Sequence, residues 1–472
     1  MLKNKIEHGV VDLVKSMTEG KEWKQILLFT LPLMAGSLLQ QLYNTVDGVV
    51  VGNFVGADAL ASVGTCASLT MLFLALAIGM SAGCSIVVSQ YFGAKQIEEM
   101  RKAVSTAVIM LVVMGLVLSV VGVVAARPLL EHVLNVDARY LEDAAAYFGI
   151  YAVGLVFQFT YNIFSAILRS LGDSKATLYF LLVSSVVNIV LDLLFVKVLS
   201  WGVAGAAIAT VIAQAVSAVV CVFYMFTKHP ILRFAKGEFR FHREKFLLAL
   251  RLGVPTMLQQ CIISCGHVAI QRIINTFEVT NVGLMAGYTA AVRVENFVLI
   301  PIFAFNMGMA TFTGQNMGAG RFDRVKRGLW RTELMGVLCC VTLGMISYVA
   351  AEPLVRMFGL SEGNGLEYGI QYIHFIAPLF AIFCFYLILA GLIQGSGDVL
   401  CSTTASVTSL LFRIAVAYFQ AFCTTVGYRA AWVSIPLGWL WALVILGLRY
   451  RSGKWKEKAI TNQKRNEIPE EG

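Results

Sequence analysis

Charged residues are scarce in this sequence. They make up 14% of the 472 residues, against about 25% in ordinary soluble domains. Hydrophobic residues make up 58%, and the mean hydropathy is +0.74. A water-soluble protein of this length needs more polar surface than that, so the composition excludes a soluble globular fold. Alternating polar and apolar residues, the pattern of a membrane barrel, are also lacking. An all-α membrane protein is the class that remains.

Signatures of several other protein classes are missing as well. The ten cysteines include no Cys-x-x-Cys pair and lie mostly in apolar runs, where a thiol packs as a small apolar group. The six histidines have no metal-ligand spacing. No phosphate-binding loop is present, which argues against ATP as the energy source. A Gly-x-Ser-x-Gly pattern at 79–83 lies in an apolar run rather than a strand–turn–helix, so an intramembrane hydrolase is a poor alternative.

Long apolar runs dominate the chain instead. Runs of about 20 apolar residues are long enough to cross a membrane as helices. They predict twelve spanning helices, at 25–52, 60–88, 103–126, 140–165, 176–196, 203–227, 246–271, 282–312, 332–350, 367–393, 399–424 and 430–448.

The distribution of lysine and arginine predicts the topology. With twelve spans and a cytoplasmic N-terminus, 29 of the 37 basic residues lie in cytoplasmic segments and six in outside loops. Positive charge gathers on the cytoplasmic side of membrane proteins. Both termini are therefore expected in the cytoplasm, in a bacterial cytoplasmic membrane. The dispersed basic residues argue against a nucleic-acid partner.

The two halves of the chain resemble each other. Shifts of 225 residues, and of 223 near the start, superpose matching residues: Gln90 on Gln315, Tyr147 on Tyr372, Asp173 on Asp398 and Pro32 on Pro255. Each half holds six spans, so we expect two six-helix bundles related by a pseudo-two-fold axis along the membrane normal. The predicted segments are a cytoplasmic N-terminal segment, an N-terminal lobe, a basic linker, a C-terminal lobe and a basic tail, at 1–24, 25–227, 228–245, 246–449 and 450–472.

Polar residues inside spans mark the candidate site. A charged side chain at the bilayer centre costs about 2.5–3.5 kcal/mol on insertion scales, so it needs a function or a partner. Asp47 lies in the first span, Asn188 and Asp192 in the fifth, and Thr210 in the sixth. If these spans converge, two carboxylates, an amide and a hydroxyl form a cation-coupling site for H⁺ or Na⁺. The competing interpretation is hydrogen bonding between helices.

Further polar residues extend this site or lie in the second half. The candidate cavity residues, which helix packing would explain equally well, are Gln40, Tyr43, Asn44, Asn162 and Gln214. Pro32 removes a backbone donor and is expected to kink the first span. In the second half, Glu295 and Arg413 are expected to form an ion pair or to contribute to binding.

Five motifs carry a resemblance to a known family. The stretch PLMAGSLLQQLYNTVDGVVVGNFVGADALASVG at 32–64 resembles the opening signature of the multidrug and toxic compound extrusion (MATE) family. The other matches are SQYFGAK at 89–95, ILRSLGDS at 167–174, GQNMGAG at 314–320 and IQGSGD at 393–398. The acidic pattern is similar to the DinF/MepA-like branch, whose N-lobe cation site matches Asp47, Asn188, Asp192 and Thr210.

This resemblance implies a function. It implies export of drugs or toxic compounds, often lipophilic cations, by two rocking lobes in exchange for H⁺ or Na⁺. No cofactor beyond the coupling ion and no enzymatic activity are expected, and the expected partners are small molecules and the lipid bilayer, with the protein monomeric. The alternative within the same superfamily is a flippase for lipid-linked precursors, which would need a strongly basic cavity.

Overall fold

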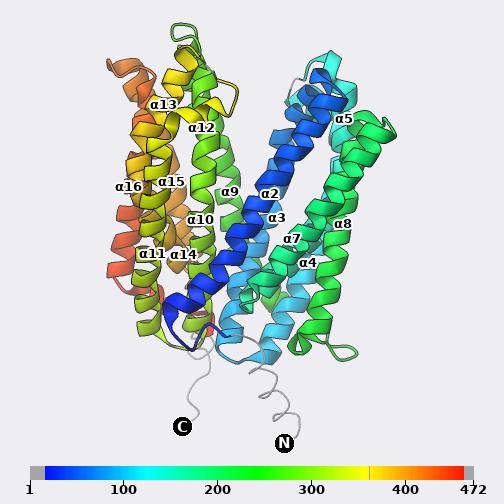
Figure 1. The fold of residues 1–472 in the computed structure, drawn as a ribbon. Coiled ribbons are helices and arrows are strands. Elements are labelled where there is room, and N and C mark those ends of the chain that lie inside the picture. The colour runs from blue at the N-terminus through cyan, green and yellow to red at the C-terminus, as the bar shows by residue number, and fades with distance from the viewer. Residues whose placement is uncertain (1–15, 135, 361, 462–472) are drawn as a thin grey trace, which may run out of the picture. The chain divides into compact units, whose positions relative to one another are not determined.

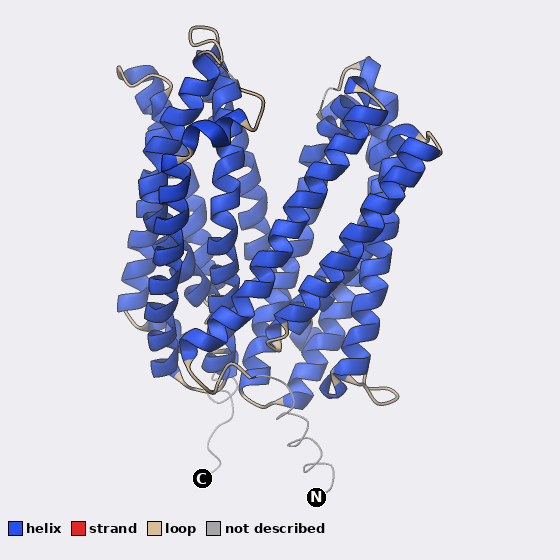
Figure 2. Cartoon of the chain, viewed as in Figure 1, coloured by secondary structure: helices blue, strands red, loops and turns tan. Residues whose placement is uncertain are grey.

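The computed structural model describes residues 16–134, 136–360 and 362–461, and every regular element in that part of the chain is helical (Figure 2). Most of the predicted N-terminal segment 1–24 and the end of the tail 450–472 lie outside the described residues. The part of the tail that is described contains a short 3₁₀ helix, Lys454–Lys458.

The helices fall into two compact units. Unit 1 contains residues Leu31–Leu258, and unit 2 contains Met17–Thr30 together with the residues from Gln259 onward. The helices that lie mainly or wholly in unit 1 are α2 (Glu22–Phe54), α3 (Ala57–Gly93), α4 (Ile97–Pro128), α5 (Ala138–Val153), α6 (Leu155–Ser170), α7 (Ser174–Asp192) and α8 (Gly202–Lys228). Those that lie mainly or wholly in unit 2 are α9 (Arg243–Glu278), α10 (Leu284–Gly318), α11 (Phe322–Val349), α12 (Ala351–Arg356), α13 (Asn364–Ile376), α14 (Phe380–Gly395), α15 (Val399–Cys423) and α16 (Arg429–Arg451).

Corresponding helices pack in corresponding ways within each unit. In unit 1, α3 packs on α6. Helix α7 packs on α8 (Figure 1). In unit 2, α10 packs on α14, and α15 on α16. The buried core of unit 1 includes Cys66, Phe148 and Ala207. Similar packing in both halves agrees with the internal repeat.

The described residues contain eleven helices, or connected helical runs, that are long and apolar enough to cross a membrane, plus one bent pair. Many extend beyond the predicted limits. Helix α3, for example, has 37 residues, although about 20 cross the hydrocarbon core. The predicted boundaries are too short because hydropathy detects only the apolar part of a helix.

The bent pair is α5 and α6, which the sequence had predicted as one continuous span at 140–165. The two helices meet at Gly154 with a bend of 45°. A Cβ atom at Gly154 would lie 2.8 Å from Val211 Cγ2 and 3.0 Å from Gln214 Oε1 on α8. Glycine therefore allows α8 to approach the bend closely.

Two helices are divided between the units. The division falls between Thr30 and Leu31 in α2, and between Leu258 and Gln259 in α9. Each division lies within a few residues of an internal proline, Pro32 or Pro255, and both helices continue through it. The predicted lobe limits, drawn from hydropathy and the repeat, assign each of these helices to a single lobe and do not detect the division.

The turn between α6 and α7 is held by Asp173. Its carboxylate accepts hydrogen bonds from the Ala176 N–H (3.1 Å) and the Tyr224 hydroxyl (3.0 Å) and lies 3.0 Å from His229 Nε2. Burial alone would raise the pKa of Asp173, but the contacts with His229, Ala176 and Tyr224 outweigh burial and hold this pKa below its ordinary value.

We therefore expect Asp173→Asn to lower stability at neutral pH by about 1–2 kcal/mol, because the contacts with Tyr224 and His229 lose the carboxylate charge, whereas asparagine still caps the helix. A lowered folded-state pKa stabilises the protein above the carboxyl's unfolded pKa, and the benefit disappears as pH falls through the folded value. Thermal melting of the detergent-purified protein should thus show a gap between wild type and variant that narrows in acid. A gap independent of pH would contradict this role.

Candidate cation and substrate site

Two helices of unit 1 bring the predicted carboxylates together. Asp47 on α2 and Asp192 at the end of α7 lie close enough to each other to interact electrostatically. Asp192 has no exposed surface, and Asn188, one turn before it, is 2% exposed. The convergence expected from the sequence is therefore present for the two acids.

Several polar atoms at this position lack a hydrogen-bond partner although they are buried. They are Asp47 Oδ1, both carboxylate oxygens of Asp192, and both Oδ1 and Nδ2 of Asn188. Unsatisfied buried polar groups are rare in native proteins and call for an explanation, such as an unseen ion or water. Carboxylate and amide oxygens are the hard ligands that bind small metal cations, and a carboxylate also accepts a proton.

The local backbone also sets this position apart. The α-helical part of α7 ends at Asp192, and a π-helical segment, Leu193–Val198, follows directly. Segments of π-helix are uncommon and occur frequently at functional sites. The change in helical pitch turns the side chains after Asp192 relative to those before it.

Tyrosine side chains surround the acidic pair. Tyr43 lies close enough to both Asp47 and Asp192 to interact with them electrostatically, and Gln40 lies near Tyr43. Tyr147 on α5 lies near Asp47 and stacks on Tyr151, with ring centroids 6.4 Å apart. Aromatic rings next to buried carboxylates suit a cationic, partly apolar ligand.

Sequence reasoning missed part of this group. The Tyr151 hydroxyl donates a 2.9 Å hydrogen bond to Gln158 Oε1 and also lies within reach of Gln214. Tyr147 served only as a landmark of the repeat, and Tyr151 and Gln158 had no assigned role. The available signal was the tyrosine and amide residues of the one predicted span 140–165, a pattern that ordinary helix packing also produces.

The other predicted residues have varied surroundings. Thr210 donates a 3.0 Å hydrogen bond to the Ala206 carbonyl of its own helix, and Asn162 bonds the Gln158 carbonyl at 2.8 Å. Each of these contacts is local, within α8 for Thr210 and within α6 for Asn162. Asn44 is exposed, and the structure joins it to none of the groups above. The assignments of Thr210 to the cation site and of Asn162 and Asn44 to a cavity stay predictions.

Unit 2 holds a different acidic group. Glu295 on α10 accepts a 2.6 Å hydrogen bond from the Tyr372 hydroxyl on α13. Arg413 on α15 lies close enough to interact electrostatically with Glu295, but no contact within 4.0 Å joins their charged atoms in the described chain. Glu295 is therefore hydrogen-bonded to Tyr372, and Arg413, its predicted ion-pair partner, lies farther away. Tyr147 and Tyr372 occupy equivalent positions of the repeat, each near an acid.

A further buried acid escaped the sequence prediction. Glu333 on α11 is 5% exposed, and its Oε2 atom has no hydrogen-bond partner. The predicted span began at 332 and placed Glu333 at the membrane edge, whereas α11 begins three turns earlier, at Phe322. Within the described residues, no group of three or more histidine, cysteine, aspartate or glutamate side chains could hold a metal ion.

Comparison with known proteins now identifies the family. The MatE family model matches residues 32–194 and 255–419, which is one match in each half of the chain. The chain belongs to the MatE family. The family predicted from the motifs is confirmed, and this MatE protein is a membrane transporter rather than an enzyme. Its assignment to the DinF/MepA-like branch stays a prediction.

Relatives cover nearly the whole protein. The probable multidrug resistance protein YpnP of Bacillus subtilis is 28% identical over 447 residues, which are 95% of this chain and 99% of YpnP. The probable multidrug resistance protein NorM of Thermotoga maritima is 24% identical over 94% of this chain and 95% of its own.

Solved structures share the fold. An outward-facing multidrug resistance MATE transporter aligns with a TM-score of 0.86 at 23% identity, covering 94% of this chain and 98% of its own. A transporter of the MOP superfamily from Pyrococcus furiosus gives the same TM-score at 24% identity, with coverage of 94% and 98%. The predicted all-α fold of twelve membrane helices in two lobes is confirmed.

The two equivalent tyrosines give a matched test of the polar contacts. Tyr372→Phe should lower the free energy of unfolding by about 1.5–3 kcal/mol, because it removes a hydrogen bond to a carboxylate. Tyr147→Phe should change stability little, because no hydrogen bond of its hydroxyl is among the described contacts. Thermal melting in detergent measures both. Equal losses in the two variants would show that the Glu295 contact contributes nothing specific.

Proposed function

We propose that this MatE protein exports small lipophilic, often cationic, compounds in exchange for H⁺ or Na⁺. The observation that carries the proposal is the pair of neighbouring carboxylates: half-buried Asp47, with one buried oxygen that no protein group satisfies, and fully buried Asp192, with two. The relatives named multidrug resistance proteins support drugs as substrates and favour export over the flippase alternative.

Electrostatics explains why such a pair couples two ligands. Two adjacent carboxylates away from water cannot both stay charged without a compensating positive charge. A proton, a sodium ion or a cationic drug supplies it. Because each of them compensates the same charge, binding of one lowers the affinity for the others. Exchange follows if the drug site faces the cytoplasm and the ion enters from outside.

The proposed cycle has three steps. The ionised pair, with the tyrosines beside it, binds the drug. Entry of the coupling ion compensates the carboxylates and removes the electrostatic attraction for the drug. The two lobes then rock, with bending of α2 near Pro32, and the drug leaves outward. We place the protein in a bacterial cytoplasmic membrane, with both termini in the cytoplasm and one chain as the working unit.

The first test measures ethidium efflux from cells that express the protein. Asp47→Asn and Asp192→Asn should each lower efflux by about tenfold or more, the equivalent of at least about 1.4 kcal/mol of coupling. Asp143→Asn, which changes an exposed acid on α5, is the control and should leave efflux unchanged. Membrane abundance is measured in parallel. Normal efflux by both buried-acid variants would refute the proposal.

A second experiment identifies the ion. Drug uptake into inverted vesicles is measured while a pH gradient or a Na⁺ gradient is imposed, one at a time. The gradient that supports transport by wild type, and loses its effect in Asp47→Asn, is the coupling gradient. Transport that is independent of both gradients would rule out ion exchange.

A further inference from the structure

The starts of the two divided helices belong to opposite units. We call residues 17–30 the α2 arm and residues 243–258 the α9 arm. The α2 arm belongs to unit 2, although the remainder of α2 belongs to unit 1. The α9 arm belongs to unit 1, although the remainder of α9 belongs to unit 2. The chain therefore passes from one unit to the other within each of these two helices.

Glycine brings each arm into close contact with its unit. A Cβ atom at Gly308 on α10 would lie 2.6 Å from Thr30 Oγ1 of the α2 arm. A Cβ atom at Gly83 on α3 would collide with the backbone of Gly253 in the α9 arm. The shift of 225 residues places Gly83 on Gly308, and the shift of 223 places Thr30 on Gly253. The two contacts are thus equivalent positions of the repeat.

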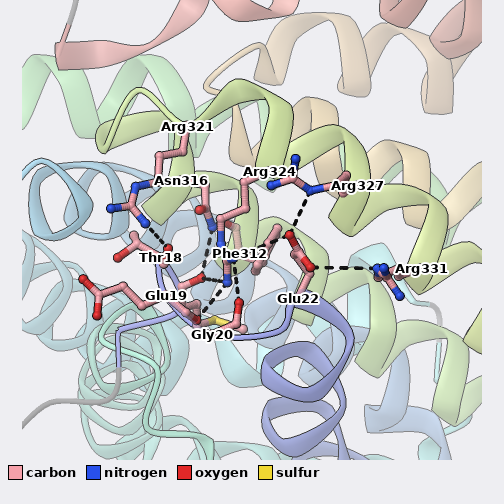
Figure 3. A network of polar contacts seen from close by, with 11 residues as sticks. Thr18, Glu19, Gly20, Glu22, Phe312, Asn316, Arg321, Arg324, Arg327 and Arg331 are labelled. Atoms are coloured by element: carbon pink, nitrogen blue, oxygen red, sulfur yellow. Dashed lines mark hydrogen bonds and ion pairs between the residues drawn. The ribbon is translucent and has the colours of Figure 1, made fainter.

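The beginning of the α2 arm is bound through its backbone (Figure 3). Arg324 on α11 donates hydrogen bonds to the carbonyls of Gly20 (2.7 Å) and Glu19 (2.8 Å), and Arg321 donates to that of Thr18 (2.5 Å). The Met17 N–H donates to Gln315 Oε1 on α10 at 2.8 Å. These four hydrogen bonds fix the position of the α2 arm on α10 and α11.

An ion pair completes each contact, and the charges are reversed between the two units. Glu22, 8% exposed, lies 3.5 Å from Arg324 and 3.0 Å from Arg327. Lys245, 2% exposed, lies 2.5 Å from Glu99 Oε2 and donates to the Tyr91 hydroxyl at 2.8 Å. The same shifts place Glu22 on Lys245 and Glu99 on Arg324. In unit 2 the acid is on the α2 arm and the arginines are on its docking helix, α11. In unit 1 the lysine is on the α9 arm and the acid is on its docking helix, α4.

We infer that these two ion pairs are permanent anchors, which position the starts of α2 and α9 on their units and stay closed throughout the transport cycle. The inference rests on the proposed export function. Each pair lies within its own unit: Glu22 and its arginines in unit 2, and Lys245 and Glu99 in unit 1. Relative movement of the units therefore does not need to break either pair. Reversed polarity also means that each arm carries the charge repelled by the other arm's docking helix.

The electrostatic part is tested on the Lys245–Glu99 pair. Lys245→Met keeps most of the packing but removes the buried partner of Glu99, which then pairs only with the less buried Lys102 at 3.2 Å, and should lower the yield of folded membrane protein by about tenfold. Lys245→Glu should lower it further, because it faces Glu99. Adding Glu99→Lys to Lys245→Glu should recover part of the loss. Equal yields for wild type, Lys245→Met and Lys245→Glu would overturn an anchoring role.

The positional part is tested by a covalent bridge. Arg327 is accessible, so Glu22→Cys and Arg327→Cys are combined in a chain whose native cysteines are replaced by alanine. A short bifunctional methanethiosulfonate reagent then joins the two cysteines, and bridging is followed by gel mobility. Each single-cysteine variant treated with the same reagent is the control.

A permanent anchor predicts that the bridged protein transports ethidium at least as fast as the unbridged one. A loss of transport on bridging that is reversed by reductant would overturn the inference, because the contact would then have to open. If the unbridged double variant and wild type both lack efflux, the export proposal fails instead, so the two failures are distinguishable.

Discussion

The proximity of two carboxyl groups on membrane-spanning helices of unit 1, one fully buried and one half-buried, is the interaction on which this account depends. An ionised carboxylate within a membrane is costly, and a second one beside it adds repulsion. In the proposed function, a proton or a cation compensates the charge of Asp47 and Asp192. Under this proposal, binding of an ion changes the net charge of the pair. The aromatic rings of Tyr43 and Tyr147 lie near the pair and suit an organic cation.

The fold provides this arrangement through its internal repeat and then departs from it. Both units carry a tyrosine at the equivalent position, Tyr147 and Tyr372, but only unit 1 sets an acid pair near its tyrosine. In unit 2, Tyr372 donates directly to Glu295, so that acid is satisfied by a protein group. The acids near the tyrosine of unit 1 thus retain unsatisfied oxygens, whereas the acid at the tyrosine of unit 2 accepts a hydrogen bond from it. The divided helices α2 and α9 supply the covalent connections through which changes in one unit reach the other.

Much of this could be predicted from the sequence, because membrane insertion imposes strong constraints. Apolar runs and the placement of lysine and arginine determine the number of spans, and motifs such as that at 32–64 indicate the family. Asp47 and Asp192 were recognisable because acids are rare in apolar runs. Tyr151 and Gln158 were not, because aromatic and amide residues also pack between helices. The bend at Gly154, the burial of Glu333 and the division of α2 near Pro32 depend on neighbours distant in sequence, which hydropathy does not encode.

Equilibrium drug binding to the purified protein tests the shared-charge claim most directly, because it needs no movement of the lobes. Ethidium affinity is measured by fluorescence while H⁺ or Na⁺ concentration is varied. The account predicts that the affinity of wild type falls as one of these ions increases, and that Asp47→Asn loses this dependence. An affinity that responds to the ion equally in wild type and Asp47→Asn, or to neither ion in wild type, would contradict it.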